Sequence, residues 1–271
     1  MHTLIFCLSS DIVGGALYNL LFHQGERNLR VVTDTDLAFA SWLHEAGSDG
    51  KFFTRIHLRD GFIIEPAMIK NVVHRIPYFQ LVHFINPVDR SYAEMEMYAL
   101  YISFLRSVKE KVVDGMHTRH INNTDNALFF YAMAVKAGLE VLENTFTSSP
   151  RWQQPKALTA VSPRKKTMVA WHKRTRHLVW ENKPVMYNEP FTSIVKLEVV
   201  GKKFFSGIGI PEKMQAQVNL FSSLIGRTVY EISLAEVNKT YKLYAVNTRP
   251  PVLSEPALEA FSLLLTSKNK N

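Results

Sequence analysis

The order of segments at the start of the chain constrains the fold more than any other feature. Residues 3–9 form an apolar run typical of a buried strand, and residues 12–23 follow with the pattern of a helix. Ser10 or Asp11 can accept hydrogen bonds from the free N–H groups of that helix. Residues 29–33 are a second short strand. Such alternation predicts a parallel, doubly wound α/β sheet, whose ligands usually lie beyond the carboxyl ends of the strands.

Local patterns predict the remaining elements of the front half. Residues 34–36 can cap a further helix that continues through Ala46, and the turn at residues 59–61 joins the two strands of a hairpin. An apolar strand then ends at Pro77, and two long helices without internal glycine or proline follow. The predicted ranges are 51–58 and 62–64 for the hairpin, 72–76 for the strand, and 91–113 and 124–137 for the helices.

The pattern changes after Pro150. Residues 151–183 are basic and show little periodicity, and short strands separated by turns follow. Strands are predicted at 184–191, 195–200, 203–206, 228–234 and 242–246, and helices at 212–224 and 255–265. This order favours an α+β half with a largely antiparallel sheet. We therefore expect an α/β domain at residues 1–115 and a second domain at residues 116–271.

The positive charge of the chain is concentrated in residues 151–183. The chain has 32 Lys and Arg against 24 Asp and Glu, which gives a formal net charge of +8. The basic segment holds nine of the cations and one acid, Glu181, so the remainder is balanced at 23 against 23. A localised basic stretch suggests an anionic partner such as nucleotide phosphates, an acidic peptide or nucleic acid. A solvated loop is the simpler alternative.

Targeting signals and cysteine usage favour a cytoplasmic protein. No run of about 18 apolar residues is present, so we expect no membrane span. The apolar start has no basic lead-in and is soon interrupted by Asp11, so it is typical of a strand rather than a secretion signal. The single cysteine, Cys7, excludes an internal disulfide and a cysteine-based metal cluster, and we expect it to be a buried apolar residue.

Three stretches, taken in order, resemble the ATP-grasp superfamily, particularly the ligases that modify ribosomally made peptides. Residues 72–77 (VVHRIP) are similar to the strand and Arg-Pro element of the front domain of those enzymes. Residues 122–147 match a pattern of asparagine loop, helix, glycine and strand, although Glu143 and Asn144 replace a proline of the family. The third stretch resembles the strand that meets the adenine and the strand pairs that follow it, at residues 183–191, 194–205, 229–234 and 244–250.

The resemblance implies a pre-ATP-grasp-like α/β domain followed by a reduced ATP-grasp-like domain that binds ATP and Mg²⁺. Ligases of this kind phosphorylate a carboxylate and let an amine or hydroxyl attack the acyl phosphate. We expect Glu189, Lys196 and Asn247 to gather around one hollow between two facing sheets. The implied roles are adenine and phosphate binding for Asn188, Glu189, Lys156 and Asn247, catalysis through phosphate contacts for Lys196 and Arg249, metal binding for Glu231 and Asn247, and substrate binding for Arg75.

The sequence also departs from the family where the cation and the phosphates should be held. Ala245 stands in place of a glutamate ligand, and Ser233, or Glu231 by a shift of register, stands in place of an aspartate. Alanine cannot bind a cation, whereas Mg²⁺ prefers carboxylate oxygens. No glycine occurs between Lys156 and Pro184, although a loop that covers phosphates needs residues without Cβ. The metal and phosphate sites are therefore depleted.

Each candidate residue has a simpler alternative. Glu189 can be a solvated carboxylate, and Lys196 can point to solvent from a half-buried strand. Asn247 can be a turn residue that bonds its own backbone. Arg75 can form a surface ion pair.

Three functions are compatible with the sequence. The first is a divergent carboxylate–amine ligase that acts on a peptide or an amino acid. The second is a catalytically inactive homologue that binds a peptide, a nucleotide or a partner ligase; a homo-oligomer is compatible with both. The third is nucleic-acid binding through the basic segment, where Trp152, Trp171 and Trp180 lie among the cations as stacking platforms would. No nucleic-acid motif surrounds these tryptophans, which disfavours the third function.

Overall fold

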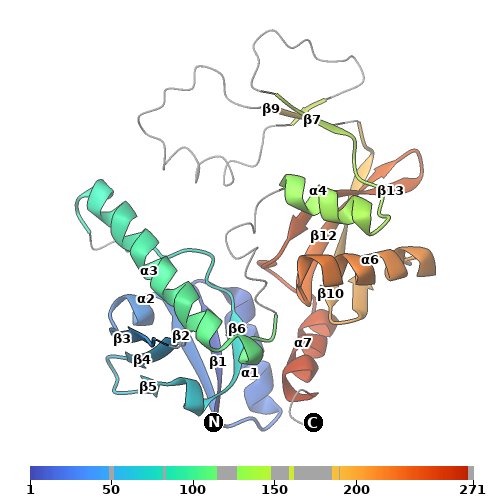
Figure 1. The fold of residues 1–271 in the computed structure, drawn as a ribbon. Coiled ribbons are helices and arrows are strands. Elements are labelled where there is room, and N and C mark those ends of the chain that lie inside the picture. Colours follow the sequence, from blue (N-terminus) through green and yellow to red (C-terminus); the bar gives the residue numbers. More distant parts are fainter. Residues whose placement is uncertain are drawn as a thin grey trace.

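A computed structural model of the chain describes residues 1–48, 52–81, 84–114, 127–147, 159–161, 185–188 and 190–267. We call residues 1–114 the front half and the described residues from 127 onward the back half. The two halves lie side by side, with the front half in blue to green and most of the back half in orange to red (Figure 1).

The front half is built on a parallel sheet. Strand β1 (His2–Cys7) lies between β2 (Leu29–Thr33) and β6 (Ile69–His74) and runs parallel to both. Because successive side chains of a strand point to opposite faces, Leu4 and Phe6 of β1 pack with helix α3 (Pro87–Ser107), while Ile5 and Cys7 pack with α1 (Ile12–His23) and α7 (Glu255–Ser267). Helices therefore cover both faces, which confirms the predicted doubly wound class.

Buried Cys7 agrees with its predicted place in the core. Burial raises the pKa of its thiol to about 11, and the nearby carboxylate of Asp11 adds to the shift. The thiol therefore stays protonated at neutral pH and is a poor nucleophile.

The predicted helix through Ala46 is wrong. The capping box of Thr33 and Asp36 does start a helix, α2 (Asp34–Ala38), but this helix is short. The next residues form β3 (Ser41–Ala46), which pairs with β4 (Phe52–His57), and β4 pairs with β5 (Ile63–Ile64). The indole N–H of Trp42 donates to the carbonyl of Leu37 at 3.0 Å, and the ring packs against the core of the front half. Strand pairing, in which alternate side chains face the core, overrides the local helix signal in these residues.

Helix α3 begins earlier than predicted because its start signal lies upstream. The side chain of Asn86 accepts a hydrogen bond from the backbone N–H of Val88, and Pro87 occupies the first helical position, where a missing N–H costs little. The helix ends at Ser107, and short 3₁₀ turns lie at Lys109–Lys111 (η2) and, ahead of β6, at Pro66–Met68 (η1).

The back half is built on an antiparallel sheet. Its strand order is β11 (Lys203–Ser206), β10 (Ser193–Val200), β12 (Val229–Val237) and β13 (Thr240–Asn247). Helices α4 (Ala127–Lys136) and α6 (Glu212–Ile225) cover one face of it. The predicted turn between β12 and β13 is confirmed, with Asn238 and Lys239 at φ values of 50° and 65°, as a tight hairpin turn requires.

A further small sheet lies beyond β13 (Figure 1). It consists of β7 (Asn144–Thr147), β9 (Val185–Asn188) and β8 (Thr159–Val161), all antiparallel. The sequence predicts β9. It does not predict β8, which lies within the basic, aperiodic segment of residues 151–183. The antiparallel sheets of the back half confirm the second part of the predicted fold class.

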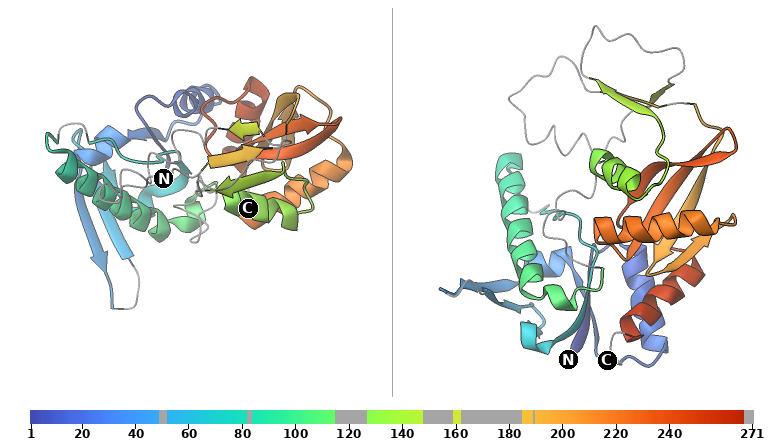
Figure 2. Two further views of the ribbon diagram at one scale, coloured as in Figure 1. Left: turned by 90° about the horizontal axis from the view of Figure 1, so that it is seen from above. Right: turned by 45° about the vertical axis from the view of Figure 1, so that its right-hand side comes forward.

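A shared core joins the two halves. Helix α7, at the end of the described chain, lies beside α1 of the front half (Figure 2). Phe261 and Leu265 of α7 are buried with Leu17 of α1 and Val229 of β12 in one cluster. The predicted boundary at residue 115 opens a segment, 115–126, that lies outside the described residues, and the division into domains stays a prediction. Among the described helices, none is both long and apolar enough to cross a membrane.

Candidate functional site

The antiparallel sheet has one apolar and one polar face. Tyr230 and Ile232 of β12 are buried against α4 and α6. The alternate residues of the strand have side chains on the opposite face of the sheet. The strand register places polar residues of three strands together on that opposite face. They are Lys196 and Glu198 of β10, Glu231 and Ser233 of β12, and Asn247 of β13. The sheet therefore brings together three of the predicted site residues, Lys196, Glu231 and Asn247.

The centre of this polar face is an ion pair between Lys196 and Glu231. The distance from Lys196 Nζ to Glu231 Oε2 is 3.0 Å. The glutamate side chain is 7% exposed, whereas the lysine side chain is 66% exposed. Lysine thus covers a buried carboxylate from the solvent side, and the carboxylate is already neutralised by a cation of the chain itself.

Asn247 lies directly opposite Glu231 on the neighbouring strand. Its side-chain oxygen accepts a hydrogen bond from the backbone N–H of Arg249 at 3.1 Å, which is the turn that a short polar side chain forms with its own backbone. Ala245 lies opposite Ser233, at a point where a bulge follows Ser233 in the pairing. The position that the resemblance assigns to a glutamate ligand therefore presents only a methyl group, opposite Ser233.

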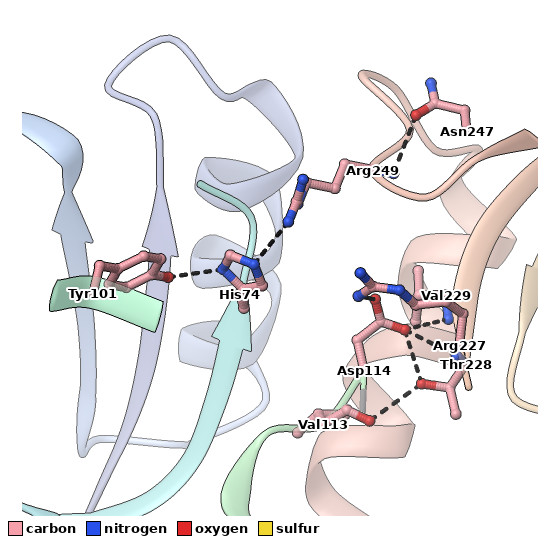
Figure 3. A network of polar contacts seen from close by, with 9 residues as sticks. All are labelled: His74, Tyr101, Val113, Asp114, Arg227, Thr228, Val229, Asn247 and Arg249. Carbon is pink, nitrogen blue, oxygen red and sulfur yellow. Dashed lines mark hydrogen bonds and ion pairs between the residues drawn. The ribbon is translucent and has the colours of Figure 1, made fainter. Parts of the chain in front are cut away.

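Arg249 reaches across to the front half. Its Nη2 lies 2.7 Å from Nε2 of His74, at the carboxyl end of β6, and His74 Nδ1 lies 2.8 Å from the hydroxyl oxygen of Tyr101 on α3 (Figure 3). A guanidinium can only donate hydrogen bonds, so Nε2 must accept and Nδ1 must carry the proton. His74 is therefore neutral. Burial lowers its pKa well below the ordinary value, and the charges of Arg249, Arg227 and Arg75 lower it further.

Arg75 is held in a buried ion pair. Its Nε donates to Asp11 Oδ2 at 2.6 Å and its Nη2 to Asp11 Oδ1 at 3.0 Å. The same Nη2 donates to the carbonyl of Pro250 at 2.8 Å. Asp11 also caps α1 through the backbone N–H groups of Val13 and Gly14. Most of the donors of Arg75 are engaged by the chain, and its role in substrate binding stays a prediction.

A second ion pair, which the sequence analysis missed, ties β12 to the front half. Arg227 Nη1 donates to Asp114 Oδ2 at 3.0 Å. Asp114 Oδ1 accepts from the backbone N–H groups of Thr228 at 2.9 Å and Val229 at 2.8 Å (Figure 3). These residues are 113 or more positions apart, and no local pattern marks them. The contacts of Asp11 with Arg75 and of His74 with Arg249 were also missed, although Asp11 follows the predicted strand 3–9 and His74 lies in the predicted strand 72–76.

Several predicted residues cannot be placed. Lys156 and Glu189 lie outside the described residues, and so do most of residues 151–183. Asn188 ends strand β9, and its side chain lies outside the described part of the chain. Their roles in adenine and phosphate binding, and the hollow expected around Glu189, stay predictions.

The residues on the polar face do not fit a magnesium ion. Mg²⁺ requires near-octahedral oxygen coordination, usually with one or two carboxylates. Here Glu231 is the carboxylate at the implied metal position, and the ammonium of Lys196 occupies its Oε2. The side-chain oxygen of Asn247 accepts a hydrogen bond from the backbone N–H of Arg249, and Ala245 offers no side-chain oxygen. Among the described residues, no group of three or more His, Cys, Asp and Glu is arranged to hold a metal ion.

Comparison with known proteins identifies the fold of the chain. No protein-family model and no curated protein matches the sequence. Among solved structures, the macrocyclase MdnC from Microcystis aeruginosa MRC, bound with the precursor peptide MdnA, is 15% identical, with a TM-score of 0.72 over 99% of this chain and 100% of that chain. This chain has the ATP-grasp fold.

Other ATP-grasp structures agree. A RiPP-associated ATP-grasp ligase from Chryseobacterium gregarium, in complex with ADP and a leader and core peptide, is 11% identical, with a TM-score of 0.69 over 100% of this chain and 98% of that chain. The D-alanine–D-alanine ligase of Bacillus anthracis, complexed with ATP, is 10% identical, with a TM-score of 0.53 over 98% of this chain and 94% of that chain. At these identities the ATP-grasp likeness establishes the fold and leaves activity and ligands open.

Proposed function

We propose that the chain is a catalytically inactive protein of the ATP-grasp fold that binds a peptide without transferring a phosphoryl group. The observation that carries this proposal is the ion pair between Lys196 and Glu231. It supplies a cation of the chain itself to the carboxylate from which a metal site of this fold would be built.

Phosphoryl transfer makes demands that this site does not meet. Metal ions bridge the phosphates and neutralise the charge that develops during transfer, and positioned cations hold the phosphates. Ala245 stands where one carboxylate ligand is implied, Lys196 neutralises Glu231 at the other implied position, and Asn247 is engaged with the backbone of Arg249. The sequence between Lys156 and Pro184 also lacks the glycines that a phosphate-covering loop needs.

A peptide is the ligand that the comparisons support best. The structures of MdnC and of the Chryseobacterium ligase both contain peptides, and both match this chain over nearly its whole length. The basic composition of residues 151–183 supports a peptide with acidic residues. A partner ligase, a homo-oligomer and a cytoplasmic location remain predictions from the sequence.

Magnesium-dependent ligation of a peptide carboxylate to an amine is the second candidate. One observation favours it: Glu231 and Asn247 lie opposite each other on adjacent strands, so the chain retains two oxygen donors at the implied metal position. In this reading a bound cation would displace the ammonium of Lys196, whose exposed side chain is free to move away.

Release of ADP from ATP distinguishes the two candidates. With Mg²⁺, ATP and a library of acidic peptides, the wild-type protein should release ADP no faster than the Glu231→Gln variant. Glu236→Gln, on the same strand, is the matched control for handling and contaminants. Release that requires Mg²⁺ and peptide, persists in Glu236→Gln and is lost in Glu231→Gln would establish the ligase instead.

A further inference from the structure

Strand β3 lies at the edge of the small antiparallel sheet of the front half. The strand order of that sheet is β3, β4 and β5, and no described strand pairs with the outer side of β3. The hairpin of β3 and β4, in blue, projects from the body of the front half (Figure 2). An edge strand presents a row of backbone N–H and C=O groups that can pair with a further strand.

The sequence of β3 lacks the features that usually protect a sheet edge. Protected edge strands are very short, or they carry lysine, proline or a bulge. Strand β3 (Ser41–Ala46) has six residues without lysine or proline, and its pairing with β4 runs without a register shift. Apart from His44, its only acidic or basic residue is Glu45. The edge is therefore suited to pairing with another strand.

The outer face of β3 carries an exposed apolar side chain at its middle. The side chains alternate, so Trp42 packs against the core of the front half, whereas Leu43 points outward and is 43% exposed. Leu43 lies opposite Arg55 of β4. Phe53, the other exposed apolar residue of this face, lies opposite Glu45. A strand that adds to this edge would cover Leu43.

We propose that two copies of this chain dimerise by antiparallel pairing of their β3 strands about a two-fold axis at Leu43. A two-fold interface uses the same surface of both copies, so the strand must be complementary to itself. Leu43 of one copy then lies opposite Leu43 of the other, and Glu45 lies opposite Ser41, whose hydroxyl can donate to it. On the inner face Trp42 lies opposite His44. The centre is an apolar pair, and no like charges lie directly opposite each other.

The neighbouring registers are less favourable. An axis at Trp42 would set the apolar side chain of Leu43 against Ser41. An axis at His44 would set it against the carboxylate of Glu45. Because the overlap is limited to residues 41–45 of each copy, the interface is smaller than that of a standard complex, and we expect dissociation in the micromolar range. An extended peptide is the other possible occupant of such an edge.

Sedimentation velocity of the full chain tests the dimer. Between about 1 and 100 µM, the wild-type protein should shift from monomer to dimer. Leu43→Glu should weaken dimerisation at least about tenfold, because it removes the apolar pair and sets two carboxylates opposite each other. Within one copy the new carboxylate faces Arg55, so the hairpin should still form. Phe53→Lys is the control, because it removes an exposed apolar side chain of the same face from the inner strand β4.

Two further experiments test the register. Leu43→Lys alone should be monomeric, whereas an equal mixture of Leu43→Lys and Leu43→Glu should dimerise, because opposite charges then face each other. In Leu43→Cys the two thiols face each other, with Cα atoms about 4.5–5.5 Å apart, which is within reach of a disulfide. Mild oxidation should therefore give a covalent dimer. Glu45→Cys should not, because its two thiols lie about 13 Å apart along the strands. The native Cys7 is buried.

The outcomes separate this interface from the alternatives. A wild-type protein that stays monomeric over the whole range overturns the proposal and leaves an extended peptide as the occupant. A dimer that persists in Leu43→Glu, or is lost equally in Phe53→Lys, also overturns it. Circular dichroism shows whether each variant is folded. If Leu43→Glu does not fold, the cross-link decides, and a covalent dimer of Glu45→Cys but not of Leu43→Cys contradicts the proposed axis.

Discussion

Replacing Asp114 with alanine should lower the free energy of unfolding by about 3–5 kcal/mol, because it removes one partner of a buried ion pair. Both Asp114 and Arg227 have side chains that are 9% exposed. The substitution leaves the guanidinium of Arg227 without its counter-charge and the backbone N–H groups of Thr228 and Val229 without their acceptor. Denaturation by urea, followed by circular dichroism, measures the change.

The control for this prediction is Glu110→Ala. The side chain of Glu110 is 87% exposed, and its Oε1 lies 3.7 Å from Nζ of Lys109. Loss of such an exposed ion pair should leave the unfolding midpoint unchanged. If the Asp114→Ala protein does not fold, Asp114→Asn retains an oxygen acceptor and should show a smaller loss. An Asp114→Ala protein as stable as Glu110→Ala would mean that the ion pair does not hold the two halves together.

Stability should fall as the pH is lowered below about 6.5, the ordinary pKa of histidine. Burial holds the pKa of His74 well below that value in the folded protein, and the neighbouring arginines lower it further. Between the two pKa values the unfolded chain takes up a proton that the folded chain does not, so His74 contributes a stability that is lost with falling pH. The loss is at most about 1.4 kcal/mol per pH unit.

Two histidine variants isolate this contribution. His74→Gln retains an oxygen that can accept from Arg249 but cannot titrate, so its stability should fall less steeply than that of the wild type between neutral and mildly acidic pH. His23→Gln, at an exposed position near the end of α1, should retain the wild-type slope. Equal slopes for all three proteins in urea denaturation would show that His74 does not titrate as expected.

The fold could be predicted wherever local signals and packing agree. The alternation of strand and helix in residues 3–33 predicts the parallel sheet, because each apolar run is long enough to be identified alone. The same reasoning fails at residues 41–46. A real capping box at Thr33 and Asp36 precedes them, but pairing of β3 with β4 decides their conformation. Strands β7 and β8, of four and three residues, are too short to show a period.

The candidate site could be predicted only in part. The resemblance names Glu231 and Asn247, and the register of β12 and β13 brings them opposite each other. The contacts that decide their chemistry are long-range: Lys196 with Glu231 across 35 positions, and Arg249 with His74 across 175 positions. A single sequence carries no periodic signal for such pairs. The sequence therefore predicts which metal ligands are missing, and the folded chain shows the ion pair of Lys196 with Glu231 at the implied position.

We propose that Lys196 takes the place of a divalent cation at Glu231. The most direct test is calorimetric titration of ADP into the protein, once with millimolar MgCl₂ and once with EDTA. We expect the same binding, or the same lack of it, under both conditions. ADP that binds at least about tenfold more tightly with Mg²⁺, with this gain lost in Glu231→Gln, would show a working cation site and contradict the claim.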